Sequence, residues 1–154
     1  MILTVLLNAG IIIAAFAGME FIAWFTHKYI MHGFLWVLHK DRHVPHKGKF
    51  ELNDLFVLWF TAPAVLAFIF GIRNTIWPLI SLGIGITLYG ISYTLFHDVM
   101  FHRRIKWLKI PSKSPYFKRI INAHRAHHKT TKQYPTEAFG FLWAPKRYEE
   151  KTRQ

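Results

Sequence analysis

The chain contains three long stretches without a charged residue. They run from Met1 to Met19, from Leu55 to Ile72 and from Asn74 to Phe96. A helix needs about 20 apolar residues to cross a bilayer, with a working range of about 17 to 25. The pattern therefore predicts three membrane-spanning helices. The first extends over about Ile2–Thr26, because apolar residues continue beyond Glu20.

Glycine, proline and short polar residues predict where these helices end or bend. Gly33 is expected to break the helix that continues from the first span. Asn53 or Asp54 is expected to cap the second span. Pro63 lies inside that span and is expected to kink it, whereas Pro78 falls in the first turn of the third span, where proline is tolerated.

The remaining segments are short. Residues 34–49 are expected to lie at the membrane interface, and Ser114 is expected to cap a last helix over about Pro115–Lys129. Residues 145–154 are expected to be a solvated tail. The fold class predicted for residues 1–154 is a single all-α integral membrane helical bundle with three to four membrane-embedded helices.

The positions of the charges favour a membrane topology over nucleic-acid binding. The net charge is +12, which alone is also typical of nucleic-acid-binding proteins. However, 19 of the 20 basic residues lie at 28–49 or 103–153, and three spans place both regions on one side. Because cytoplasmic loops collect Lys and Arg, we expect these regions at the cytoplasmic face of the inner membrane, against anionic lipid, and the N-terminus outside.

All ten histidines fall in three clusters, at 27–46, 97–102 and 124–128. Each cluster lies at or beyond the basic end of a predicted span, so the topology brings all three to one face. On a helix His124, His127 and His128 lie within an arc of about 100° that continues an apolar face. Imidazoles directed into a protein need partners, and a metal ion would supply them.

Spacing within the other clusters adds to this prediction. His39 and His43 are four residues apart, which suits chelation from one helical face. His27 and His32, like the pair His97 and His102, are five apart, about 140° around a helix. Such a pair suits a helix wedged between two ions or a local bulge, so a two-metal centre is favoured. His46 is either an interfacial anchor or a further ligand.

The ligand type limits which metals can bind but does not identify the metal. An all-imidazole site suits zinc, copper, iron or nickel. Zinc would indicate hydrolysis or a structural role, and two iron ions would indicate O₂ chemistry. The chain has no cysteine, so an iron–sulfur cluster held by cysteine is excluded and electrons must come from a separate carrier. The membrane setting favours oxidation of a lipid. A non-catalytic haem or metal-binding protein and a metal transporter are the alternatives.

Four histidine boxes resemble those of the membrane fatty-acid-hydroxylase-like non-haem di-iron superfamily: His27-x₄-His32, His39-x₃-His43, His97-x₄-His102 and His124-x₂-His127-His128. Further strings resemble the bacterial β-carotene 3-hydroxylases over residues of about 18–148: Glu20-Phe-Ile-Ala-Trp-Phe-Thr-His27, Met31-His-Gly-Phe-Leu-Trp36, Asn53-Asp-Leu-Phe56, His97-Asp98 with Phe101-His-Arg-Arg-Ile-Lys-Trp107, and Phe139-Gly-Phe-Leu142 with Ala144-Pro-Lys146.

The resemblance implies a di-iron centre, with zinc as a possible metal in isolated protein, and O₂ as co-substrate. It also implies a ferredoxin-type electron donor and hydroxylation of β-carotene at C3 of the β-ionone ring, giving β-cryptoxanthin and zeaxanthin. Related outcomes on a similar site are carotenoid ketolation and the hydroxylation or desaturation of a fatty acid or sterol. The metal ligands it implies are the nine histidines of the four boxes.

One position departs from the family pattern. The second box of the family reads His-x₂-His-His, whereas this chain has Arg42 before His43. A guanidinium is always protonated and cannot ligate a metal. The tenth ligand position therefore falls to His46 or to a water molecule.

Four residues are candidates for supporting roles. Glu20 is an ionisable residue within an apolar span, and Asp98 lies four residues before His102. Either carboxylate is expected to orient a ligand histidine or to serve an ordinary packing or capping role. Tyr89 and Tyr93 share a helix face with His97 and are candidates to line a channel for the substrate; the alternative is ordinary helix packing.

Overall fold

Helices are the only regular elements in the part of the chain that the computed structural model describes, which is residues 1–44, 50–102, 107, 114–134 and 137–149. The five α-helices are α1 (Ile2–Phe25), α2 (Trp36–His39), α3 (Leu55–Arg73), α4 (Trp77–Tyr93) and α5 (Pro115–His128). Two π-helical segments extend α1 and α4: η1 (Thr26–Phe34) and η4 (Thr94–Phe101). Short 3₁₀ turns occupy Lys40–Arg42, Leu52–Asp54 and Lys146–Tyr148. The all-α prediction is confirmed.

Three of these helical stretches are long and apolar enough to cross a membrane. They are Ile2–Phe34, Leu52–Arg73 and Trp77–Phe101, among the residues described. Most large apolar side chains of α1 and α3 face outward, such as Leu3 and Leu58, which are 80% and 68% exposed. Outward apolar side chains are what a bilayer requires, so the chain is an integral membrane protein.

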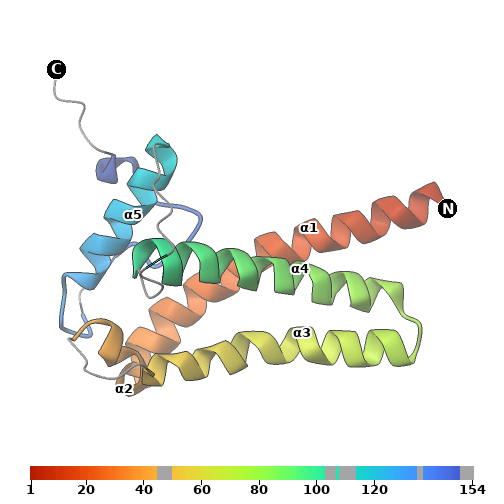
Figure 1. The fold of residues 1–154 in the computed structure, drawn as a ribbon, viewed down its shortest axis with the longest axis horizontal. Helices are drawn as coiled ribbons and strands as arrows, with labels where there is room; N and C mark the ends of the chain where they lie inside the picture. The colour runs from red at the N-terminus through yellow and green to blue at the C-terminus, as the bar shows by residue number, and fades with distance from the viewer. Residues whose placement is uncertain (45–49, 103–106, 108–113, 135–136, 150–154) are drawn as a thin grey trace. The chain divides into compact units, whose positions relative to one another are not determined.

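The chain divides into two compact units, and the first consists of Met1–Ile22 and Asp54–Ser92. Within it α1 and α4 run in one direction and α3 runs in the other (Figure 1). Small residues permit close approach of α1 and α4: a Cβ on Gly85 would lie 2.6 Å from both the Ala15 Cβ and the Ile12 carbonyl oxygen. Ser81 on α4 also donates a hydrogen bond to Asn8 on α1 (2.7 Å). Small residues and interhelical hydrogen bonds are typical of membrane helix packing.

The predicted helix ends are only partly correct. The helical geometry breaks at Gly33, where ψ is −127°, as expected. Pro78 lies in the first turn of α4, and α3 continues through Pro63. Neither Asp54 nor Ser114 makes a side-chain cap, although each precedes a helix. For Asp54 the reason is the preceding 3₁₀ turn, which holds its backbone in the helical region instead of the extended region that a cap needs.

The second unit consists of Ala23–Asn53 and Tyr93–Gln154. Its small apolar core joins Ile120 and Ala123 of α5 to Ala144, with Tyr148 packed against them. We expected residues 145–154 to be a solvated tail; in the described part, residues 145–149, Lys146, Arg147 and Glu149 are exposed, whereas Tyr148 is half-buried. The ring of Tyr148 covers apolar surface, and Glu149 forms an ion pair with Arg119 (2.7 Å).

Candidate metal centre

The π-helical segments explain the five-residue spacing of two histidine pairs. In η4 the N–H of His102 donates to the carbonyl of His97 (3.0 Å), five residues before it. Hydrogen bonding between residues five apart brings those residues to the same face. The ring centroids lie 5.2 Å apart for His27 and His32 and 4.6 Å apart for His97 and His102. The predicted local bulge is therefore confirmed, and the alternative of these helices wedged between two ions is wrong.

Helix α5 contributes to both sides of the histidine cluster. His127 packs against His32, with ring centroids 4.9 Å apart. One residue further along, His128 packs against His102 at 4.7 Å. Consecutive residues point about 100° apart on a helix, so α5 presents one imidazole to each side. It is α5 that lies between two groups of histidines.

The structure brings nine histidines from three distant segments together in the second unit. Their ring nitrogens form three groups in which all candidate donor atoms lie within 4.8 Å of one another. The first group is His27, His32, His39 and His127; the second is His97, His102, His124 and His128; the third joins His43 to His127 and His128. His46 lies outside the described residues. Groups of four imidazoles at this spacing could each hold a transition-metal ion.

Hydrogen bonds fix the orientation of most of these rings through Nδ1. Five rings donate to a main-chain carbonyl and a sixth donates to the Asn53 carboxamide, at 2.7–3.0 Å. The acceptors are Phe139 for His27, Gln133 for His32, Asn53 for His39, Thr130 for His43, Glu137 for His127 and Arg42 for His128. A carbonyl can only accept, so each Nδ1 carries the proton. In the neutral ring Nε2 then presents a lone pair.

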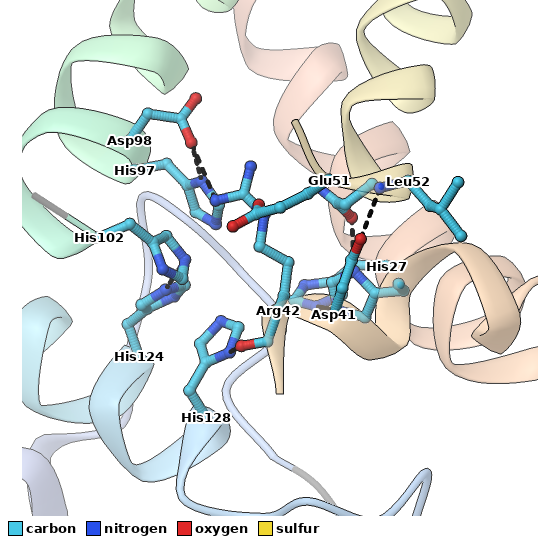
Figure 2. A network of polar contacts seen from close by, with 12 residues as sticks. His27, Asp41, Arg42, Glu51, Leu52, His97, Asp98, His102, His124 and His128 are labelled. Atoms are coloured by element: carbon cyan, nitrogen blue, oxygen red, sulfur yellow. Dashed lines mark hydrogen bonds and ion pairs between the residues drawn. The ribbon is translucent and has the colours of Figure 1, made fainter. Parts of the chain in front are cut away.

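The Nε2 atoms of several rings face one another. The Nε2 atoms of His27 and His39 lie 3.1 Å apart. Those of His102 and His124, which Figure 2 shows, lie 3.0 Å apart. The Nε2 atoms of His43 and His128 are buried without a hydrogen-bond partner. Two nitrogens that are each about 2.1 Å from one ion, at right angles, lie about 3.0 Å apart. The arrangement therefore fits metal ions, which would satisfy groups that otherwise repel.

Burial keeps the imidazoles outside the spans neutral. Loss of water, followed by the neighbouring imidazoles, lowers the pKa of His124 well below its usual value. Burial likewise lowers the pKa of His43 to about 4 and that of His127 to about 3, against the opposing effect of their carbonyl acceptors. Neutral imidazole is the form that binds a metal, so these pKa shifts favour metal binding near neutral pH.

Sequence reasoning missed most of the groups that orient the rings. Asn53 was one of two candidates to cap α3, with Asp54, but its side chain accepts a hydrogen bond from His39 Nδ1 (2.7 Å). The carbonyls that hold His27 and His127 belong to Phe139 and Glu137, in a segment that makes no regular element. Main-chain acceptors leave no signature in residue type, so only the fold reveals them.

The four supporting candidates separate into two pairs. In the first unit the Tyr89 hydroxyl donates to Glu20 (2.8 Å), and Tyr89 is 2% exposed. In the second unit Tyr93 stacks on His97 at 4.5 Å, and Asp98 lies 3.4 Å from His97 Nδ1. Tyr93 and Asp98 thus contact a histidine of the second group, whereas Glu20 and Tyr89 contact each other; a channel role for either tyrosine stays a prediction.

Aromatic side chains form an apolar wall beside the second group. Phe101 lies 4.7 Å from the His124 ring, centroid to centroid. Phe101 also lines a small cavity together with Phe96, Tyr116, Phe117, Ile120, Phe141 and Leu142. The histidines are therefore next to a surface that favours hydrocarbon over a polar ligand.

Comparison with known proteins agrees with this geometry. The family model described as fatty acid hydroxylase matches residues 12–145. A β-carotene hydroxylase of Pseudescherichia vulneris is 43% identical over 92% of this chain and 79% of its own length. A β-carotene hydroxylase of Pantoea ananas is 44% identical over 90% of this chain and 78% of its own length. The chloroplastic β-carotene 3-hydroxylase 2 of Arabidopsis thaliana is 34% identical over 90% of this chain and 46% of its own length. No solved structure matches the chain.

Proposed function

Because the chain belongs to the fatty acid hydroxylase family, we propose that it hydroxylates a carotenoid in the membrane. The substrate is β-carotene, and the reaction inserts oxygen from O₂ at C3 of the β-ionone ring to give β-cryptoxanthin and then zeaxanthin. The observation that carries the proposal is the likeness to bacterial proteins named β-carotene hydroxylase over more than three quarters of their length. The apolar wall beside His124 supports a hydrocarbon substrate.

The nine clustered histidines are the proposed ligands of two iron ions. The first group, together with His43, would hold one ion, and the second group would hold the other. Bound iron supplies the reductive activation of O₂, which the side chains of the chain cannot provide themselves. Zinc fits the same donors and is the metal we expect in protein isolated without added iron.

The protein residues have three tasks in this proposal. The carbonyls and Asn53 hold Nδ1 of their rings, so that Nε2 stays directed at the ion. Burial of rings such as His32 and His127, which are 0% and 1% exposed, excludes water from the site. The same burial keeps His43 and His127 neutral and therefore able to ligate.

The source of the electrons and the orientation of the chain in the membrane complete the proposal. The chain has no cysteine, which supports a separate ferredoxin-type donor. The basic residues at 28–49 and 103–153 support a cytoplasmic site and C-terminus with the N-terminus outside. A soluble reduced donor reaches a histidine centre on that side directly.

Expression in a host that accumulates β-carotene tests the proposed reaction. The pigments should shift to β-cryptoxanthin and zeaxanthin, and His124→Ala should abolish the shift while leaving the protein in the membrane. Arg73→Gln, at the exposed end of α3, is the control and should retain the products. Unchanged β-carotene with folded, iron-loaded protein would reject the substrate, and a ketocarotenoid product would reject the hydroxylation.

A further inference from the structure

Arg42 is a buried cation beside the histidines. Its side chain is 4% exposed, its Nε lies 2.6 Å from the Glu51 carboxylate, and one terminal nitrogen lies 3.2 Å from the Asp98 carboxylate. Figure 2 shows the guanidinium between these two acidic residues. A buried guanidinium needs such partners because it stays charged. Arg42 therefore joins the segment after α2 to η4.

The contact to Asp98 reaches a histidine. The same Asp98 oxygen that faces Arg42 also lies 3.4 Å from Nδ1 of His97. A carboxylate only accepts, so His97 Nδ1 carries the proton and Nε2 presents its lone pair to the second group. The guanidinium holds the carboxylate from the other side. Without it, the carboxylate would lose a charged partner that faces it from this side.

The main chain of Arg42 reaches a second histidine. Its carbonyl oxygen accepts a hydrogen bond from His128 Nδ1 (2.9 Å). His128 belongs to the same group as His97. One residue thus holds two of four rings, the first through the Asp98 carboxylate and the second directly.

We propose that Arg42 is a positioning residue for the second histidine group, acting through Asp98 on His97. The inference rests on the proposed function for its metal, but concerns binding only. The side chain of Arg42 does not ligate; it fixes the carboxylate that fixes the ring. Loss of the guanidinium should therefore weaken the ion held by the second group and leave the first ion in place.

Metal titration of the detergent-solubilised protein tests this inference, with ferrous iron under anaerobic conditions as the probe. Mössbauer spectra and chelator competition report the two sites separately from activity. Arg42→Met and Asp98→Ala should each lower the affinity of one of the two sites about 10- to 100-fold, which is typical of lost ligand-orienting partners. Because both substitutions act on the His97 ring, the double variant should bind iron at that site no more weakly than the single variant with the lower affinity.

Two controls separate positioning from general stability. Glu51→Gln keeps the Asp98 contact and should lower thermal stability while both affinities stay within about threefold of wild type. Arg119→Gln removes a comparable ion pair, with Glu149 (2.7 Å), and should leave both sites unchanged.

The inference is overturned if Arg42→Met and Asp98→Ala both keep two wild-type sites, if their effects on affinity add in full, or if Glu51→Gln weakens the same site equally. If Arg42→Met does not fold, the test rests on Asp98→Ala, and an unchanged iron affinity of the second-group site in that variant overturns the inference. A wild-type protein that binds fewer than two ions would instead contradict the proposed di-iron function.

Discussion

The Nε2 atoms of His32 and His127 lie 3.1 Å apart, although 95 positions separate the two residues in the chain. Each ring donates its Nδ1 proton to a main-chain carbonyl, of Gln133 and Glu137 respectively. Neither Nε2 then has a proton to share, so their approach is unfavourable unless a cation lies between them. The most buried pair of side chains in the described residues is thus arranged for a metal.

Replacing one member of this pair should remove both metal and activity. In His32→Ala we expect hydroxylated product to fall at least about 100-fold, because losing a ligand should exceed the effect of losing an orienting partner. Iron should fall from two ions to about one per chain. Pigment analysis and elemental analysis measure the two effects. Full iron content in a folded His32→Ala protein would contradict the assignment of this residue.

Asn53 offers a test of ring orientation. Asn53→Leu removes the acceptor of His39 Nδ1 and should weaken metal binding about 10- to 100-fold. Asn53→Asp keeps an oxygen at the same place and should bind within about threefold of wild type. Chelator competition measures both affinities. Equal losses in the two variants would show that the size or charge at position 53 matters and the hydrogen bond does not.

Removal of the metal should lower the thermal midpoint of unfolding as well as the activity. The clustered ring nitrogens of the first and second groups lose their shared cation, and ligand binding to the folded state alone stabilises that state. Iron added back should restore both quantities, whereas zinc should restore the thermal midpoint only. A chelated protein that melts at the same temperature as the loaded one would argue against a buried metal centre.

Acid should destabilise the metal-free protein. His43 and His127 have pKa values of about 4 and about 3 in the folded chain, against about 6.5 when unfolded. The unfolded state therefore binds more protons below pH 6.5, and stability falls as the pH drops from about 6.5 towards 4. Thermal midpoints measured from pH 8 to pH 4 check the direction. A midpoint that rises over this interval would contradict the neutral, buried state of these rings.

Substitution by alanine at two glycines of α4 should have different effects on stability. Gly85→Ala should destabilise the protein by about 1–3 kcal/mol, because the added methyl would lie 2.6 Å from atoms of Ala15 and Ile12. A Cβ added at Gly90 would meet no atom within 4 Å beyond the adjacent backbone of its own helix, so Gly90→Ala should be neutral or stabilise the helix by up to about 1 kcal/mol. Thermal unfolding in detergent compares the two. Equal effects would reject the close approach of α1 and α4.

The sequence predicted the elements well because each depends on local chemistry. Long apolar stretches gave the three spans, and Ser114-Pro115 placed the start of α5 correctly even though Ser114 makes no side-chain cap. The grouping of the nine histidines could also be anticipated, since topology placed the three clusters at one face. Spacing alone did not predict that α5 would be shared between the groups.

What the sequence could not give is the support around the rings. The carbonyls of Phe139 and Glu137 come from irregular chain, and their identity as acceptors depends on the path of the backbone. Arg42 was expected only to be unable to ligate, so that His46 or a water molecule would take its place. Its contacts with Glu51 and Asp98 depend on segments that are distant in sequence, which no local pattern specifies.

The two π-helical segments impose a limit on how this chain can vary in length. A π turn accommodates one more residue than the α turn it replaces, and that residue sets the count between His27 and His32. Apolar residues that face lipid can be exchanged for others of similar size, because the bilayer requires only that these side chains are hydrophobic. Deleting or inserting a single residue between His27 and His32, or between His97 and His102, would instead rotate everything beyond it and separate the paired rings.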